Sequence, residues 1–294
     1  MTWALALLTA ISMQAQQPEP ELADPKPGVQ DTWAAVKNVT LQWGSTDVRY
    51  SRSQPAQGGK SLVLDAWRGE RVSAQAVLST PIDLTRVTME VSDLKSGSHS
   101  IPSACVRKYF VRYVMTDWHA NKADSFLLPD HLSPEAEMRV AAHTTRPLWL
   151  DVRVPQDARP GTYKGTLAVT CDGKTLTLPL SMRVCSRTLP APSEWAFHLD
   201  LWQNPYAVAR YFGVPLWSQE HFDHMRPLMK LLADAGEKVI TCSIIQHPWN
   251  SQTYDPFESM IAKMRQVDGT WKYDYTVFDR WVQFMMDCGI DQQI

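Results

Sequence analysis

Hydrophobic and polar residues alternate along much of the chain between residues 36 and 190. One run places small or apolar side chains at Val72, Ala74, Ala76 and Leu78, with polar residues between most of them. The same alternation recurs over residues 87–91 and 150–154. A period of two with one apolar face is typical of antiparallel strands that are packed on one side. Since Gly, Pro, Ser and Asp break these runs, we expect an all-β sandwich domain over residues 36–190.

The clearest local pattern in this region is a hairpin centred on Asp172-Gly173, a two-residue turn signal. The turn and the apolar pattern agree on one register, with Leu167 and Val169 on the same face as their partners. This register pairs Val169 with Leu176, Leu167 with Leu178, and Cys171 with Lys174. Pro179 cannot donate a ladder hydrogen bond, so it predicts an edge strand or a bulge.

The pattern changes after Pro190-Ala-Pro192, where strand-like and helix-like segments begin to alternate. The expected order is a strand at 195–202, a helix at 218–235, a strand at 239–245, an inserted hairpin within 260–273, a helix at 276–287 and a third strand from 289. Strands separated by helices indicate a parallel sheet. We therefore expect residues 191–294 to form the incomplete start of an α/β barrel of the (β/α)8 type, truncated before closure.

Helix boundaries in this second region follow from capping residues. Ser218 is expected to cap the first helix and Gly236 to end it. Pro227 interrupts that helix and predicts a kink or two shorter helices. Thr276 and Asp279 resemble a capping box at the start of the second helix.

The N-terminal residues have the pattern of a targeting sequence. An apolar run over residues 3–11 is followed by Ser12–Ala15, which resembles a secretory signal with cleavage before Gln16. The run is too short to span a bilayer. We expect a signal peptide at residues 1–15, a Pro- and Glu-rich linker at 16–35, and a periplasmic or secreted protein.

The amino-acid composition and charge exclude few classes of protein. The 294 residues carry a net charge of −2, which gives no reason to expect nucleic acid or an anionic membrane as a partner. The five cysteines are widely spaced without a CxxC motif, so free thiols are favoured over a zinc ribbon. A Cys171–Cys185 disulfide is not expected, and no cofactor is indicated.

Candidate binding residues follow the two expected barrel strands, because barrel enzymes gather their chemistry at the carboxyl ends of strands. They are His198, Asp200, Trp202 and Gln203 after the first strand, and His247 and Trp249 after the second. Asp200 is either a ligand for sugar hydroxyls or a buried structural hydrogen-bonding group. The two tryptophans and His247 suit sugar stacking and hydroxyl contacts, although such residues also occur in cores.

Glu220, His221 and His224 are candidates for a metal site, since His221 and His224 share a helix face. With no third ligand in view, a solvated helix face is the favoured interpretation.

The second region contains the segments His198–Pro205, Trp217–Phe222, Ala233–Gly236, His247–Trp249, Asp268–Tyr275 and Phe278-Asp279. Together these segments resemble glycoside hydrolase family 123, and Pro160–Tyr163 is similar to that family's N-terminal domain. The resemblance implies an exo-acting hydrolase that removes terminal β-linked N-acetylgalactosamine from glycans. It also implies a retaining mechanism in which the 2-acetamido group of the sugar is the nucleophile, an exception to the ordinary two-carboxylate scheme.

In that mechanism a consecutive Asp-Glu pair orients the acetamido group and protonates the leaving oxygen. The chain contains no Asp-Glu dipeptide. We therefore expect a fragment that lacks its catalytic residues and is inactive by itself, with a glycan ending in N-acetylhexosamine as the substrate of the parent enzyme. The alternatives are a non-catalytic carbohydrate-binding or scaffold module of the sandwich type, or a barrel enzyme of another class such as a metal-dependent hydrolase.

Overall fold

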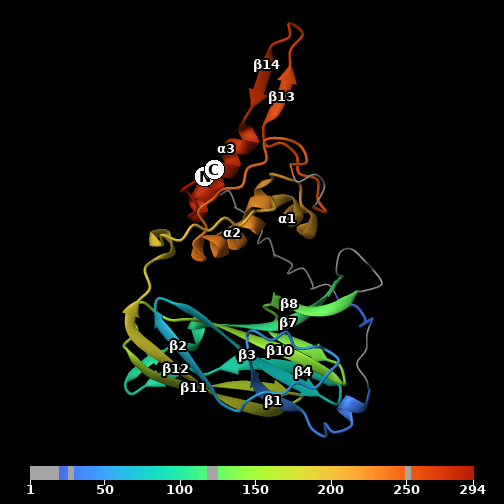
Figure 1. The fold of residues 1–294 in the computed structure, drawn as a ribbon, viewed down its shortest axis with the longest axis vertical. Helices are drawn as coiled ribbons and strands as arrows, with labels where there is room; N and C mark the ends of the chain where they lie inside the picture. Colours follow the sequence, from blue (N-terminus) through green and yellow to red (C-terminus); the bar gives the residue numbers. More distant parts are fainter. Residues whose placement is uncertain (1–19, 26–29, 118–124, 249–252) are drawn as a thin grey trace, which may run out of the picture. The chain divides into compact units, whose positions relative to one another are not determined.

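The computed structural model describes residues 20–25, 30–117, 125–248 and 253–294. The chain divides into two compact units, one from Pro18 to Leu189 and one containing Pro190 to Ile294, and each is described separately (Figure 1). The expected signal peptide at residues 1–15 lies outside the described residues. Within the described residues, no helix is long and apolar enough to cross a membrane.

The first unit consists of two sheets. One sheet has the strand order β1 (Thr40–Gly44), β3 (Arg71–Thr80), β10 (Thr144–Arg153), β7 (Val106–Thr116) and β8 (Phe126–Ser133). The other has the order β2 (Leu62–Arg68), β12 (Lys174–Thr188), β11 (Gly161–Cys171), β4 (Leu84–Val91) and β9 (Glu137–Val140), with β5 (Leu94–Ser96) on β11 and β6 (His99–Ile101) on β5. The described residues of this unit also contain two short 3-10 turns, Gln30–Trp33 and Ser103–Cys105.

A single hydrophobic core joins the two sheets. Leu78 and Leu150 from the first sheet and Val87 and Leu167 from the second are fully buried in one cluster. These are apolar positions of the alternating runs. Packing on one face is confirmed for β4, whereas β3 is buried on both faces from Ala74 to Thr80. The indole nitrogen of Trp43 in β1 also donates to the Pro179 carbonyl in β12 at 2.9 Å, which links the sheets at one end.

The predicted hairpin register is confirmed by β11 and β12. Leu167 faces Leu178, Val169 faces Leu176 and Cys171 faces Lys174. β12 is not an edge strand, because β2 pairs with it in parallel from Leu180 onward. Pro179 lies one residue before that ladder begins, so its missing N–H leaves no gap in the pairing with β2.

The expected linker at residues 16–35 requires a correction. Glu21 forms ion pairs with Arg146 in β10 and with Arg52, and Trp33 is buried with its indole nitrogen 2.9 Å from the Ser53 carbonyl. The described parts of this segment are therefore anchored to the sandwich. A Pro- and Glu-rich composition does not reveal such contacts, because one carboxylate and one indole are enough to make them.

The described residues of the second unit form three α-helices and a hairpin. They are α1 (Pro205–Phe212), α2 (Gln219–Asp234), α3 (Thr276–Cys288) and the strands β13 (Ala262–Arg265) and β14 (Trp271–Asp274), preceded by a 3-10 turn at Pro192–Glu194. Phe222 and Met225 of α2 pack with Trp281 and Met285 of α3 in a separate hydrophobic core. Helix α1 was not predicted, whereas α2, the inserted hairpin and α3 were.

Two details of these helices differ from expectation. Helix α2 starts at the Ser218 cap as predicted and continues through Pro227 as one helix, so the alternative of two shorter helices is wrong. Pro227 is exposed, so water can satisfy the backbone carbonyl that loses its partner. The capping box at α3 is wrong: Asp274 accepts from both the amide and the hydroxyl of Thr276, at 2.9 and 2.6 Å.

The expected barrel strands are present only as isolated parallel contacts. Leu199 pairs with Glu237 and Val239 pairs with Gln293, each as a single bridge. The three segments thus run side by side in the order expected for the first strands of a barrel. A truncated barrel is not confirmed, since the described residues form no continuous parallel ladder there.

Replacing Tyr163 by Phe tests the packing of the sandwich. The Tyr163 ring is fully buried and its hydroxyl donates to the Arg159 carbonyl at 2.8 Å. We expect Tyr163→Phe to lower the free energy of unfolding by about 1 kcal/mol, because a part-buried carbonyl loses its donor. Urea denaturation measures this effect. Tyr254→Phe, at a largely exposed position, is the control, and equal loss in both variants would contradict the assignment.

Candidate functional site

The candidate site lies where three parallel segments end in the second unit. The first segment runs to Gln203, the second from Glu237 to Ser243, and the third covers the last residues before Ile294. The Lys238 amide donates to the Leu199 carbonyl at 3.1 Å, and the Ile240 amide donates to the Gln293 carbonyl at 2.8 Å. Side chains beyond these contacts lie at the carboxyl ends of neighbouring parallel segments, which is the usual place for a binding site in α/β folds.

Two buried polar side chains connect the first and second segments. The carboxylate of Glu237 accepts from the Leu201 amide at 2.8 Å and from the Val239 amide at 3.0 Å. The Gln203 amide group donates to the Leu201 carbonyl and to the Val239 carbonyl, and its oxygen accepts from the Thr241 amide at 2.7 Å. We call Gln203 and Glu237 the polar clamp, because their side chains make the hydrogen bonds that strand ladders normally make.

The clamp changes the interpretation of Gln203. It was predicted to line a pocket, but it is buried and both ends of its amide group are bound to backbone atoms. A buried amide with those partners positions the chain rather than a ligand. Glu237, which sequence reasoning did not single out, has the same role.

The other residues predicted on the first segment are exposed. Trp202 is 67% exposed and presents a broad aromatic surface, while His198 and Asp200 are also exposed. Of the two alternatives for Asp200, the buried structural group is therefore wrong, and the ligand for sugar hydroxyls stays a prediction. The absence of a closed sheet on this segment leaves the carboxylate in contact with solvent, so it needs no structural hydrogen bond.

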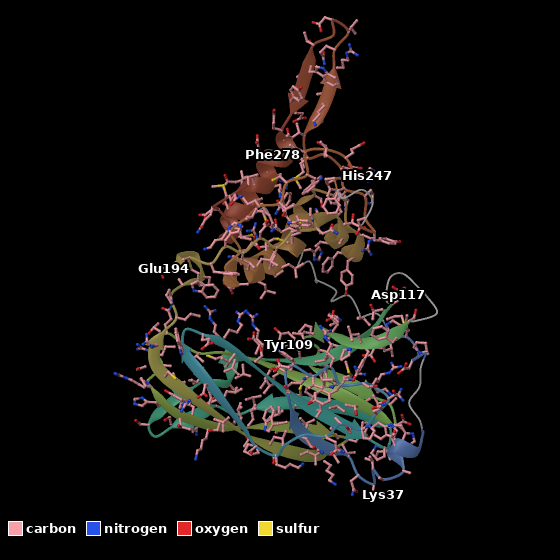
Figure 2. The ribbon with its side chains drawn as sticks, in the orientation of Figure 1. Lys37, Tyr109, Asp117, Glu194, His247 and Phe278 are labelled. Carbon is pink, nitrogen blue, oxygen red and sulfur yellow. The ribbon has the colours of Figure 1, made fainter. Side chains whose placement is uncertain are left out.

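On the second segment, His247 is exposed and lies at a left-handed backbone position with φ of 50° (Figure 2). Its amide donates to the Phe257 carbonyl at 2.8 Å, which fixes the turn after the segment. Trp249, the remaining predicted residue, lies outside the described residues.

A cavity of about 340 Å³ lies beside α1 and was not anticipated. Arg210 from α1 binds Asp255 through two hydrogen bonds of 2.6 and 3.2 Å, and its guanidinium lies over the Tyr254 ring at 4.8 Å. Tyr206 lines the same cavity and donates its hydroxyl to the Glu258 carbonyl at 2.7 Å. Arg210 and Asp255 are 45 positions apart, so no local sequence pattern links them.

His221 and His224 do not form a metal site. His221 is fully buried; one ring nitrogen accepts from the Trp217 amide at 3.1 Å and the other donates to the Pro205 carbonyl at 2.9 Å. Burial lowers the pKa of His221, in line with a neutral ring. His224 stacks on Phe212 at 3.9 Å. The favoured interpretation of a solvated helix face is thus wrong as well, since His221 belongs to the interior.

Comparisons with known proteins agree on one class, a glycoside hydrolase built from a sandwich and a catalytic domain. Residues 43–171 match the glycoside hydrolase 123 N-terminal domain, and residues 202–294 match the glycoside hydrolase 123 catalytic domain. A family 123 glycoside hydrolase from Clostridium perfringens, solved to explain glycolipid glycan hydrolysis, is similar over 86% of this chain, with 26% identity and a TM-score of 0.81. The chain belongs to glycoside hydrolase family 123. The chain spans 46% of the length of the Clostridium structure.

Other comparisons add nothing to this assignment. The PapD-like domain 7 of human CEP192 covers 58% of this chain and 97% of its own, at 14% identity and a TM-score of 0.26. The CooA pilin subunit of enterotoxigenic Escherichia coli covers 51% and 99%, at 12% identity and a TM-score of 0.28. These scores are too low to support an argument, and no curated protein sequence matches the chain.

Replacing Glu237 by Gln tests the polar clamp. An amide offers one acceptor where the carboxylate offers two, so one of the two backbone N–H groups then faces an NH2 group. We expect the second unit to lose about 1–3 kcal/mol of stability. Thermal unfolding followed by circular dichroism at 222 nm reports this, since the α-helices of the described residues all lie in this unit. Glu258→Gln, whose exposed side chain is outside the clamp, is the matched control, and equal melting of the two variants would refute the role of Glu237.

Proposed function

We propose that this chain is part of an exported glycoside hydrolase that removes terminal β-linked N-acetylgalactosamine from glycans. The observation that carries the proposal is the match of residues 202–294 to the family 123 catalytic domain. It is supported by the likeness to the Clostridium enzyme, which acts on glycolipid glycans, over both units of this chain.

The proposed reaction retains the configuration of the sugar. The carbonyl oxygen of the 2-acetamido group attacks the anomeric carbon, the bond to the leaving oxygen breaks, and a carboxylic acid protonates that oxygen. Water then opens the cyclic intermediate. An Asp beside the acid orients the acetamido group, and the 294 residues contain no such consecutive Asp-Glu pair. We assign no catalytic residue to this chain.

The role proposed for this chain is to bind the sugar ring. The exposed indole of Trp202 offers a flat apolar face next to the polar clamp, and stacking on such a face suits the apolar side of a pyranose. His198, Asp200 and His247 are exposed polar groups on the same two segments and can bond to sugar hydroxyls. Trp249 is proposed as a further stacking residue. A rigid clamp beneath these groups would keep them in place when sugar binds.

An assay with an aryl β-N-acetylgalactosaminide tests the proposal. We expect the 294-residue chain to be inactive, because a positioned general acid alone contributes on the order of a hundred- to ten-thousand-fold. A longer form of the protein that includes the Asp-Glu pair should hydrolyse the substrate. In that form, Trp202→Ala should raise KM by a few-fold to about tenfold.

Trp67→Ala, at another exposed tryptophan on β2, is the matched control for Trp202. Turnover by the 294-residue chain would show that its own residues supply the acid. Inactivity of the longer form would contradict the proposed substrate. An unchanged KM in Trp202→Ala would remove Trp202 from the site.

A further inference from the structure

The hairpin of β13 and β14 lies outside both hydrophobic cores. All of its strand residues are exposed, and none of them belongs to a core cluster of the described residues. Figure 1 shows the two strands projecting away from the helices of their unit. A two-stranded hairpin without cover is only marginally stable in water. Its side chains therefore serve no core, and their chemistry points to another use.

The pairing of the two strands sorts their side chains by chemistry. Arg265 lies opposite Trp271, and Lys263 lies opposite Tyr273. Directly paired residues share one face of an antiparallel ladder, so two aromatic rings and two cations lie together. We call these four residues the aromatic-basic face. The other face carries the remaining pairs, Met264 with Lys272 and Ala262 with Asp274.

The rings of the aromatic-basic face are open to solvent and continue toward α3. Trp271 is 55% exposed and Tyr273 is 47% exposed. The Tyr275 ring, also exposed, has its centroid 6.4 Å from that of Tyr273 and 6.4 Å from that of Phe278. Neighbouring large side chains exposed in this way commonly mark a surface that binds a partner.

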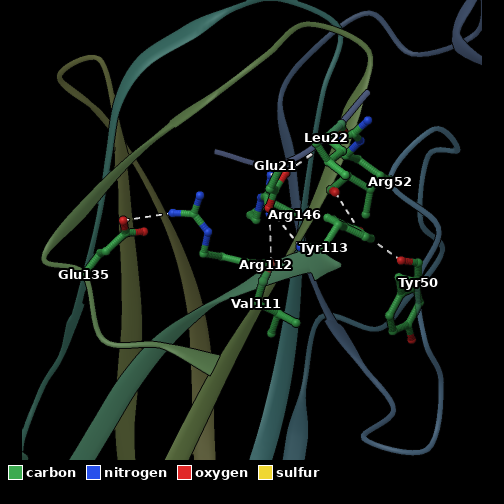
Figure 3. Close-up of polar contacts among 10 residues, drawn as sticks. Glu21, Leu22, Tyr50, Arg52, Val111, Arg112, Tyr113, Glu135 and Arg146 are labelled. Carbon is green, nitrogen blue, oxygen red and sulfur yellow. Dashed lines mark hydrogen bonds and ion pairs between the residues drawn. The ribbon is translucent and has the colours of Figure 1, made fainter. Parts of the chain in front are cut away.

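The cations of this face are not neutralised within the chain. In the part of the chain that the structure describes, neither Lys263 nor Arg265 forms an ion pair. Lys263 donates one bond, to the Ile244 carbonyl at 2.8 Å, which leaves two of its N–H groups for a ligand. By contrast, Glu21 neutralises the buried Arg146 of the sandwich (Figure 3).

The acidic residues of the hairpin do not oppose this charge. Asp274 lies on the other face and accepts from the amide and the hydroxyl of Thr276. Asp268, in the turn, accepts from the amide and the hydroxyl of Thr270 at 2.9 and 2.6 Å. The aromatic-basic face is therefore positive, and charge complementarity calls for an anionic partner.

The combination of aromatic rings with only two cations favours an acidic sugar chain as that partner. Aromatic faces stack on the apolar side of pyranose rings, and Lys and Arg bind carboxylates. A nucleic acid carries a phosphate at every nucleotide and is usually bound by a larger basic patch, whereas this chain has a net charge of −2. Membership of a glycoside hydrolase family also makes carbohydrate the polymer that the chain meets.

We propose that the aromatic-basic face binds an acidic glycan. Trp271 and Tyr273 stack on its sugar rings, and Arg265 and Lys263 bond to its carboxylates. This surface is separate from Trp202 and His247, and the proposal concerns binding rather than hydrolysis. Its test therefore needs no catalytic turnover, so its failure is distinguishable from a failure of the proposed function.

Fluorescence anisotropy with an end-labelled, unsulfated chondroitin hexasaccharide tests this proposal on the full chain. The probe alternates N-acetylgalactosamine with glucuronic acid, so it supplies both pyranose rings and carboxylates. The same hexasaccharide with its carboxyl groups reduced to alcohols is neutral, and we expect it to bind at least about fivefold more weakly. Hexathymidylate, which offers bases and phosphates instead, should also bind more weakly than the acidic hexasaccharide.

Variants on the two faces of the hairpin locate the site. Trp271→Ala and Arg265→Gln should each weaken binding of the acidic hexasaccharide by about two- to tenfold. Lys272→Gln removes the same unit charge from the other face, so it is the matched control and should bind as the wild-type chain does. The circular dichroism spectrum should not change, because all three positions are exposed.

No binding of the acidic hexasaccharide, equal binding of its reduced form, or equal effects of Arg265→Gln and Lys272→Gln would overturn the proposal. Tighter binding of hexathymidylate would overturn it in favour of a nucleic acid. Sedimentation velocity covers the remaining occupant of the face. A dimer of the wild-type chain that Trp271→Ala dissociates would show that a second copy of the chain covers the face, and would also overturn the proposal.

Discussion

The arrangement of the second unit depends on two buried polar side chains that replace missing strand pairing. Glu237 and Gln203 between them satisfy the amides of Leu201, Val239 and Thr241 and the carbonyl of Val239. Without these partners, the buried amide and carbonyl of Val239 would be unpaired, at about 1–3 kcal/mol each, and the part-buried amides of Leu201 and Thr241 would lose their acceptors. The clamp therefore makes it possible for the first and second segments to run in parallel with only one ladder bridge between them.

The two units place different demands on the sequence. The sandwich is held by one apolar core between two sheets, and its long strands make regular ladders. The second unit has a smaller core between α2 and α3, where aromatic and sulfur-containing side chains predominate. The segments that carry the proposed binding residues are irregular, so specific side-chain contacts determine their positions. Trp202, proposed to bind sugar, lies on this irregular part, as is common for binding residues supported by a rigid scaffold.

Local patterns predicted much of the fold. Asp172-Gly173 and the alternation around it gave the register of β11 and β12 correctly, because turn and pleat are both short-range properties. Helix α1 could have been found from Asn204-Pro205, since Asn204 caps the Ala207 amide and Pro205 suits the first turn. The contacts of the site and of the N-terminal segment were harder to predict from the sequence. Glu237 lies 36 positions from the Leu201 amide, and Glu21 lies 125 positions from Arg146, so neither contact leaves a periodic signal.

Amide hydrogen exchange, measured by NMR on the wild-type chain, tests the clamp most directly. The amides of Leu201, Val239 and Thr241 bond to side chains, whereas those of Ile240 and Gln293 bond to backbone carbonyls. If the clamp replaces the ladder, the first three should be protected to a similar degree as the last two. Exchange of Leu201, Val239 and Thr241 at the rate of an unstructured chain, with Ile240 and Gln293 still protected, would contradict it.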